Sequence, residues 1–67
     1  MGQFDRITQR ADVMGGKACI RGTRVTVGMI VGQIAAGDGI DDVLTAYPYL
    51  EREDVLQALR YARAIPL

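Results

Sequence analysis

The sequence has no histidine, no tryptophan and a single cysteine, Cys19. Without histidine, the groups left for acid–base or nucleophilic catalysis are carboxylates, hydroxyls, Lys17 and Cys19, and none stands in a pattern typical of a catalytic pair. A structural zinc ion takes four cysteine or histidine ligands, and a disulfide within the chain takes two cysteines. We therefore predict a protein that is not an enzyme, with no catalytic residue, no metal site and no cofactor.

Net charge and long apolar segments are also absent. The 8 basic and 8 acidic residues cancel, so the chain lacks the basic excess of a protein that binds DNA tightly as a monomer. No apolar run approaches the length of about 18 residues that spans a membrane, and residues 1–6 lack the apolar core of a signal peptide. We expect a cytoplasmic protein without a membrane segment, in which Cys19 stays a reduced thiol.

The chain is short as well. Its 67 residues, 49% of them hydrophobic and 24% charged, fit one small globular domain over residues 1–67. In a domain of this size, the free energy gained from burial roughly cancels the cost of ordering the chain. Because neither a disulfide nor a metal adds stability, we predict a homo-oligomer, joined through N-terminal strands or through helices that meet near Gly28 and Gly32.

The hydrophobic pattern predicts a β element at the N-terminus. Apolar and polar residues alternate over residues 4–8, and a second short segment with strand-forming residues covers 18–21. The pair Gly15-Gly16 between them is a turn signal. Two strands alone are marginal in water, so we expect them to pack against the rest of the chain or against a second chain.

Three helices are predicted in the remainder of the chain. Apolar residues recur at helical spacing in the segments 27–35, 40–46 and 52–64. Thr26 is a suitable N-cap for the first segment, and Gly37 supplies its end. The predicted fold is therefore mainly α with a short N-terminal β element.

The segment from Gly15 to Arg24 is the most unusual part of the sequence. It does not fit a P-loop, in which Gly-Lys-Ser/Thr leads directly into a helix. Arginine side chains clamp phosphates or carboxylates through paired hydrogen bonds, so one interpretation is a partner- or phosphate-binding loop. That loop comprises Lys17, Arg21, Gly22, Thr23 and Arg24. The other interpretation is structural: Arg21 and Arg24 pair with Asp38 or Asp54 and hold the strand against the helices.

The second and third predicted helices, joined by a short turn, have the order of a helix-turn-helix motif. In such a motif the first residues of the second helix read the major groove, which makes Arg52 and Gln57 possible DNA contacts. Three acidic residues surround Arg52 and repel phosphates. A second interpretation therefore places DNA contacts on the N-terminal segment, at Arg6, Arg10 and the loop.

The distribution of charge supports that second interpretation. Residues 1–24 hold five basic and two acidic side chains, residues 25–37 hold no charge, and residues 38–54 hold six acidic side chains and one basic. Any DNA binding is then expected to be weak and steeply dependent on salt. Tyr47 and Tyr49, in the turn before the third helix, are candidates for base stacking or for the rim of the core.

Several motifs resemble those of the domain-of-unknown-function 433 family, DUF433, whose members are small prokaryotic proteins. The motifs are Gly15-Gly16-Lys17, Ile20-Arg21-Gly22-Thr23-Arg24, Tyr47-Pro48 and Ala58-Leu59-Arg60-Tyr61-Ala62. They extend over nearly all of the chain, although Ala18 stands where the family usually has proline. The resemblance implies a three-helix domain of the winged-helix or homeodomain-like type, with a helix-turn-helix.

The same resemblance implies the function of an antitoxin. Such a protein would bind and neutralise a PIN-like ribonuclease toxin and would repress its own operon. A stand-alone helix-turn-helix regulator that binds DNA is the alternative. The neighbouring reading frame distinguishes the two, because only an antitoxin is expected to lie beside a gene for a small nuclease.

Overall fold

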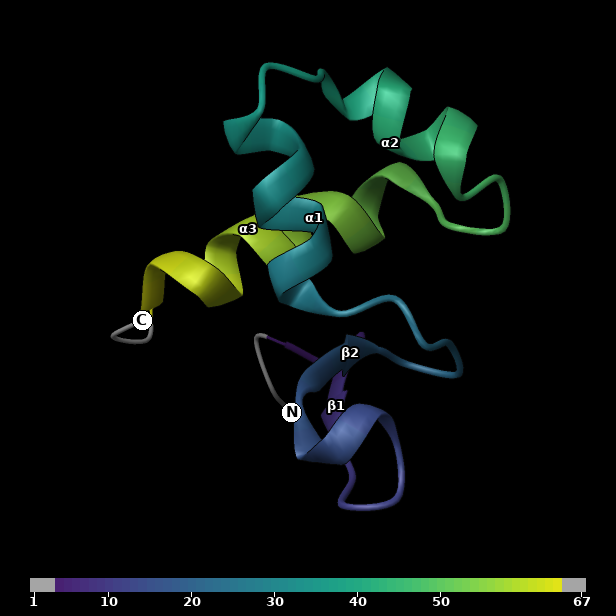
Figure 1. The fold of residues 1–67 in the computed structure, drawn as a ribbon, viewed down its shortest axis with the longest axis vertical. Helices are drawn as coiled ribbons and strands as arrows, with labels where there is room; N and C mark the ends of the chain where they lie inside the picture. Colours follow the sequence, from purple (N-terminus) through teal and green to yellow (C-terminus); the bar gives the residue numbers. More distant parts are fainter. Residues whose placement is uncertain (1–3, 65–67) are drawn as a thin grey trace.

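Three helices lie above a small β element in the computed structural model, which describes residues 4–64 (Figure 1). The mainly helical fold with an N-terminal β element is thus confirmed. None of the helices within residues 4–64 is long and apolar enough to cross a membrane. The elements are, in order, β1 (Ile7–Gln9), a 3-10 turn (Met14–Gly16), β2 (Ala18–Ile20), α1 (Val27–Ala35), α2 (Ile40–Ala46) and α3 (Arg52–Ala64).

The two strands form an antiparallel pair in which Ile7 lies opposite Ile20 and Gln9 lies opposite Ala18. The first strand was predicted over residues 4–8 and instead begins at Ile7, because residues 4–6 form a turn closed by the Ile7 N–H on the Phe4 carbonyl (3.0 Å). The predicted turn at Gly15-Gly16 is confirmed, with φ angles of 68° and 87° that favour glycine.

The ends of α1 are fixed by the two residues predicted for them. The Thr26 hydroxyl accepts the Met29 N–H (3.0 Å), and the Thr26 N–H donates to the Met29 sulfur (3.4 Å). At the other end, Gly37 adopts a φ of 107°. Its N–H donates to the Ile34 carbonyl and the Asp38 N–H donates to the Gln33 carbonyl, which is the Schellman arrangement that ends a helix at glycine.

The other two helices begin without a capping side chain at the first position. Gly39 and Glu51 occupy those positions, and in each case a carboxylate three residues later accepts the backbone N–H. The Gly39 N–H donates to Asp42 (2.7 Å), and the Glu51 N–H donates to Asp54 (2.8 Å). Each contact is half of a capping box and also places a negative charge near the helix N-terminus, where the helix dipole favours it.

One apolar cluster joins all three helices to β2. The helices contribute four completely buried residues, Ile30 from α1, Val43 from α2, and Val55 and Ala58 from α3, and Ile20 of β2 completes the centre. Among the helices, α1 packs most extensively against α3. The helices therefore form a platform, and the β element with its loops is held along one side of it (Figure 1).

Replacing Thr26 with alanine is expected to lower the free energy of unfolding by about 1 kcal/mol, because the Met29 N–H loses its acceptor at the start of α1. Urea denaturation followed by circular dichroism measures the change. Thr45→Ala is the matched control, since the Thr45 hydroxyl is exposed and bonds only to a carbonyl within its own helix. An equal loss in both variants would contradict the capping role of Thr26.

Candidate functional site

Residues 21–24 of the predicted binding loop form the tip of a second, tighter hairpin. The Ile20 N–H donates to the Val25 carbonyl (2.9 Å), and Cys19 forms a bridge with Thr26. Four residues, 21–24, connect the two sides. The Thr23 N–H donates to the Ile20 carbonyl (3.0 Å), and Gly22 has a φ of 78° at the third position of this turn, where a type II turn favours glycine.

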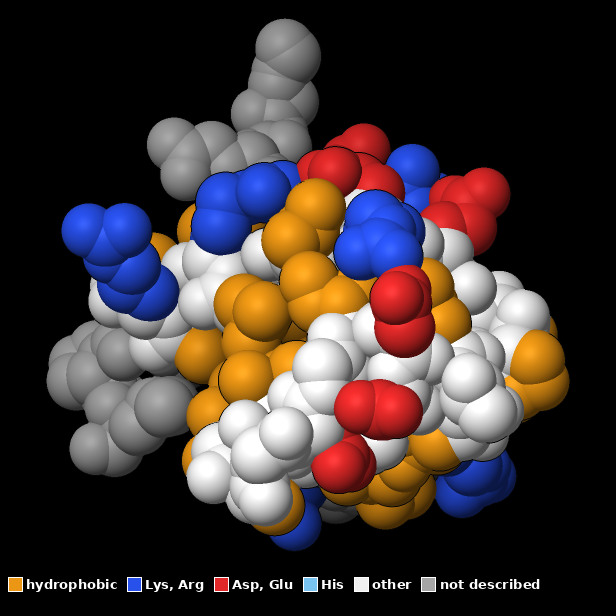
Figure 2. Space-filling view, turned by 90° about the horizontal axis from the view of Figure 1, so that it is seen from above, with side chains coloured by type: hydrophobic (Ala, Val, Ile, Leu, Met, Phe, Trp, Pro, Cys, Tyr) orange, Lys and Arg blue, Asp and Glu red, His pale blue; other side chains and the backbone are white. Residues whose placement is uncertain are grey.

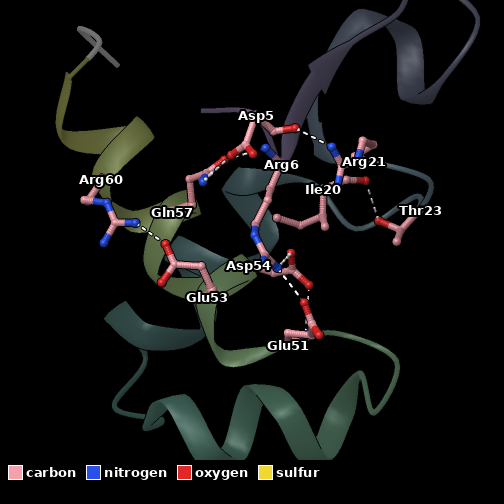
Figure 3. Close-up of polar contacts among 10 residues, drawn as sticks. All are labelled: Asp5, Arg6, Ile20, Arg21, Thr23, Glu51, Glu53, Asp54, Gln57 and Arg60. Atoms are coloured by element: carbon pink, nitrogen blue, oxygen red, sulfur yellow. Dashed lines mark hydrogen bonds and ion pairs between the residues drawn. The ribbon is translucent and has the colours of Figure 1, made fainter. Parts of the chain in front are cut away.

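Two of the loop residues are used within the fold. The Thr23 hydroxyl donates to the Ile20 carbonyl (2.9 Å) and accepts the Val25 N–H (3.0 Å). The Arg21 guanidinium donates to the Asp5 carbonyl (2.9 Å). Figure 3 shows this contact and the contact between Thr23 and Ile20. The hydroxyl of Thr23 therefore holds the turn together, and Arg21 ties the loop to the N-terminal segment while its side chain remains exposed.

Arg24 is different, because its side chain is exposed and has no hydrogen-bonding or ionic partner among residues 4–64. The proposed pairing of Arg21 or Arg24 with Asp38 or Asp54 is wrong, since Asp54 is held by Arg6 instead. Two shallow hollows meet at the loop tip. Gly22, Thr23 and Arg24 line both of them; Tyr49 borders one, and Thr8, Arg10 and Val13 border the other.

A polar cluster fastens the N-terminal segment to the start of α3 (Figure 3). One nitrogen of the Arg6 guanidinium bonds to Glu51 (2.6 Å) and to Asp54 (2.9 Å). The hydrogen bonds to Glu51 and Asp54 raise the pKa of Arg6 further above its usual range. Only 27% of the Arg6 side chain is exposed, so the contact is partly shielded from water.

Gln57 completes this cluster from inside the protein. It is 4% exposed, its carbonyl oxygen accepts the Arg6 N–H (2.6 Å), and its amide donates to the Asp5 carboxylate (3.0 Å). This hydrogen bond lowers the pKa of Asp5 from its ordinary value of 3.8. One turn later, the ring of Tyr61 meets Phe4 edge to face, with centroids 5.2 Å apart.

The structure thus places the four possible DNA contacts in different situations. The polar atoms of Gln57 are bonded inside the protein, which leaves none for a base edge in this arrangement, and Arg6 is engaged by two carboxylates. Arg52 pairs with Asp41 and Arg10 pairs with Asp12 (3.2 Å), but both of these arginines remain exposed. Asp5 and Arg6 therefore cover the face of α3 around Gln57, whereas Arg52 at its start stays open to solvent.

An apolar hollow lies between β2, the first turns of α1 and the end of α3. Ala18, Val27, Val31 and Ala62 are among the residues that line it, and Met29, which is 40% exposed, stands beside them. Lys17 is the one charged residue among its described neighbours. The predicted binding loop is thus divided. Lys17 lines this apolar hollow, and Arg24 lines the two shallow hollows at the loop tip.

Sequence reasoning named Arg6 and Gln57 only as possible DNA contacts and missed their contact with each other. The two residues are 51 positions apart, so no local periodicity connects them. The apolar hollow was missed as well, because Val31, Ala62 and the strand residue Ala18 come from three different parts of the chain. A polar residue at a core-facing position of α3, such as Gln57, was the available signal for a buried polar contact.

Comparison with known proteins places these features in a family. A model of the family described as "Protein of unknown function (DUF433)" matches residues 7–62. "Uncharacterized protein y4eO" from Sinorhizobium fredii (strain NBRC 101917 / NGR234) is 39% identical over 61 residues, which cover 91% of this chain and 28% of that protein. The crystal structure of a DUF433 member from Anabaena variabilis superposes with a TM-score of 0.88 at 34% identity, over 92% of this chain and 61% of that one.

Both relatives are longer than the segment they share with this chain. The chain spans about a quarter of the curated relative and less than two thirds of the solved one. The domain described here is therefore common to all three, and what the longer proteins do as a whole is a separate question.

The free energy of unfolding is expected to fall as the pH drops below about 4, and Asp5 should contribute to this fall. Because the pKa of Asp5 is lower in the folded protein, its contribution is present above the unfolded pKa and is lost as the pH falls through the folded pKa. Asp5→Asn keeps an oxygen for Gln57 and should flatten the pH dependence measured by urea denaturation. Asp38→Asn, at an exposed position, should leave it unchanged; flattening by both would refute the assignment.

Proposed function

The chain belongs to the DUF433 family of proteins of unknown function, and on this premise we propose that it is an antitoxin, a non-enzymatic protein that binds and neutralises a PIN-like ribonuclease toxin. The observation that carries the proposal is the apolar hollow beside α1. Residues 25–37 hold no charge, and α1 exposes Gly28, Met29 and Gly32 to solvent. An uncharged helix face beside an apolar hollow is a surface suited to a protein partner.

The chemistry of the hollow indicates what kind of toxin segment fits it. Its lining is mostly apolar, and Lys17 stands at its edge. An amphipathic helix that places an apolar side chain between Val31 and Ala62 and a carboxylate beside Lys17 satisfies both properties.

Three observations support the non-enzymatic part of the proposal. Cys19 is buried and its thiol donates to the Lys17 carbonyl (3.3 Å). Within residues 4–64, no group of three or more Cys, Asp or Glu side chains is arranged to hold a metal ion. The carboxylates of Glu51, Glu53 and Asp54 are engaged by arginines.

The alternative, a stand-alone winged-helix or homeodomain-like regulator, draws support from the order of α2, turn and α3. Against it stand the burial of Gln57 and the acidic start of α3. Repression of the antitoxin's own operon would then depend on exposed basic residues outside α3, namely Arg10, Lys17, Arg21 and Arg24.

Met29→Glu is expected to abolish toxin binding without destabilising the antitoxin. A glutamate at this position places a carboxylate on the apolar hollow, yet its side chain can accept the Thr26 N–H and complete a capping box that Met29 only imitates through sulfur. The measurement is co-purification with the product of the adjacent reading frame, together with ribonuclease and growth assays and the melting temperature of each variant.

Met14→Glu is the matched control, because Met14 is 36% exposed and lies outside the hollow. It should retain toxin binding. If Met29→Glu binds and neutralises the nuclease as well as the unaltered protein does, the hollow is not the toxin site. If the unaltered protein binds no PIN-like nuclease, the antitoxin proposal fails.

We also propose that the protein forms a homodimer through the face shown in Figure 2. Hydrophobic side chains gather there in a band, with Lys and Arg toward its upper left and Asp and Glu along its right side. A two-fold axis through such a band brings the basic edge of one copy against the acidic edge of the other. Leu56 of α3 is half-buried and lies outside the core cluster, so part of its apolar side chain is available to a second copy.

Light scattering at micromolar concentration is expected to give twice the monomer mass of 7.3 kDa. Leu56→Glu should reduce the mass to that of the monomer, because a glutamate at this half-buried position of α3 would place an unpaired charge in the interface. Met14→Glu should remain dimeric. A stable monomer of the unaltered protein would contradict the dimer, and a dimeric Leu56→Glu would move the interface elsewhere, with the exposed Gly28 and Gly32 of α1 as the next place to test.

A further inference from the structure

The tip of the hairpin loop carries a second, chemically different surface. Arg24 has no partner among the described residues, and the two hollows on either side of it contain no carboxylate in their linings. An arginine that is structural would be expected to find one of the chain's 8 acidic residues. Arg24 instead holds its charge in solvent between the two hollows, so its counter-ion lies outside the residues that the structure describes.

Backbone donors point to an anion at the same place. Within the part of the chain that the structure describes, the N–H groups of Gly22 and Arg24 donate to no protein acceptor, whereas the N–H groups of Arg21, Thr23 and Val25 are all bonded. Unbonded N–H groups in a tight turn, next to a guanidinium, are suited to phosphate oxygens. Arg10 and the Thr8 side chain border the hollow on one side of this turn.

The hollow on the other side supplies an aromatic surface. Tyr49 is 64% exposed, and its ring meets Tyr47 edge to face at 6.4 Å between centroids. Tyr47 is half-buried against the core, so the Tyr49 ring packs against a side chain that is fixed in the fold. The loop between α2 and α3 and the loop after β2 lie on the same side of the molecule (Figure 1). An exposed, supported ring beside an unpaired arginine is the combination with which proteins bind a base and its phosphate.

We infer that this surface binds single-stranded nucleic acid, with a phosphate held by Arg24 and the turn around Gly22 and with the adjacent base stacked on Tyr49. Duplex DNA does not fit this arrangement, because a paired base inside the helix has no face for Tyr49. An acidic protein segment would use Arg24 but not the ring. The inference is independent of the proposed toxin site, since Arg24 and Tyr49 do not line the apolar hollow.

The test is fluorescence anisotropy with a labelled RNA of about 10 nucleotides, DNA of the same sequence as a single strand, and the corresponding DNA duplex. We expect both single strands to bind the unaltered protein at low salt and the duplex to bind more weakly. Arg24→Ala should weaken binding about tenfold and reduce the slope of log K against log salt by about 0.7, the value for one phosphate contact on a single strand.

Tyr49 provides the readout that charge alone would not move. Tyr49→Ala should also weaken binding about tenfold, and Tyr49→Phe should restore it, because the ring is kept and the hydroxyl is not needed. Arg63→Ala is the matched control for charge, since Arg63 is exposed and has no ion pair among residues 4–64. All four variants change exposed side chains, and their melting temperatures are measured beside the affinities.

Four results would overturn the inference. The first is the absence of binding to either single strand, and the second is tighter binding of the duplex. The third is a loss with Arg63→Ala as large as that with Arg24→Ala, which would mean that binding reflects net charge. A loss with Arg24→Ala but none with Tyr49→Ala would also refute the site, because Arg24 would then bind its anion without a stacked base.

Discussion

The ion pair and hydrogen bonds of Arg6 decide how the two halves of this protein are arranged. Its guanidinium bridges two carboxylates at the start of α3, and its backbone N–H is taken by Gln57. The β element has only three residues in each strand, too few to be stable alone. By fixing the residue that precedes β1, the cluster places the strands, and with them the loop at residues 21–24, against the helices. Removing Arg6 would leave the largely buried carboxylate of Asp54 without its charged partner, a larger loss than that of an exposed ion pair.

The same cluster determines which part of α3 is accessible. A helix-turn-helix protein reads the major groove with the first residues of its second helix. Here Asp5 and Arg6 bond to Asp54 and Gln57 and cover that side of α3, while Arg52 stays exposed. The contacts also account for the acidic start of α3. Its carboxylates serve the fold twice, since Asp54 accepts the backbone N–H at the helix start and binds Arg6 with its other oxygen. Acidic residues that seemed to argue only against DNA are thus part of the connection between the two halves.

Local chemistry was sufficient to predict most of the fold. The bounds of the three helices followed from apolar spacing, and those of α1 also from Thr26 and Gly37, because capping acts within a few residues. The first strand was misplaced because a long-range contact, between Arg6 and α3, overrides the local alternation at residues 4–6. The family resemblance was confirmed, since a model of the DUF433 family matches residues 7–62. The site was harder, since the roles of Arg21 and Arg24 depend on which acids reach them, and no spacing encodes that.

The division of the loop has a geometric cause that explains how one motif serves two surfaces. Lys17 immediately precedes β2 and Arg24 follows the turn at its other end, so a strand of three residues, about 10 Å long, separates them. One end of the strand faces the start of α1 and the end of α3, and the other faces the turn before α3. Between the two, Gly22 and Thr23 are required by the turn itself. A contiguous motif can therefore combine residues that form the turn with two basic residues that line different surfaces. Because Lys17 and Arg24 are not in contact, substitutions at the two positions should have independent effects on the binding of any ligand.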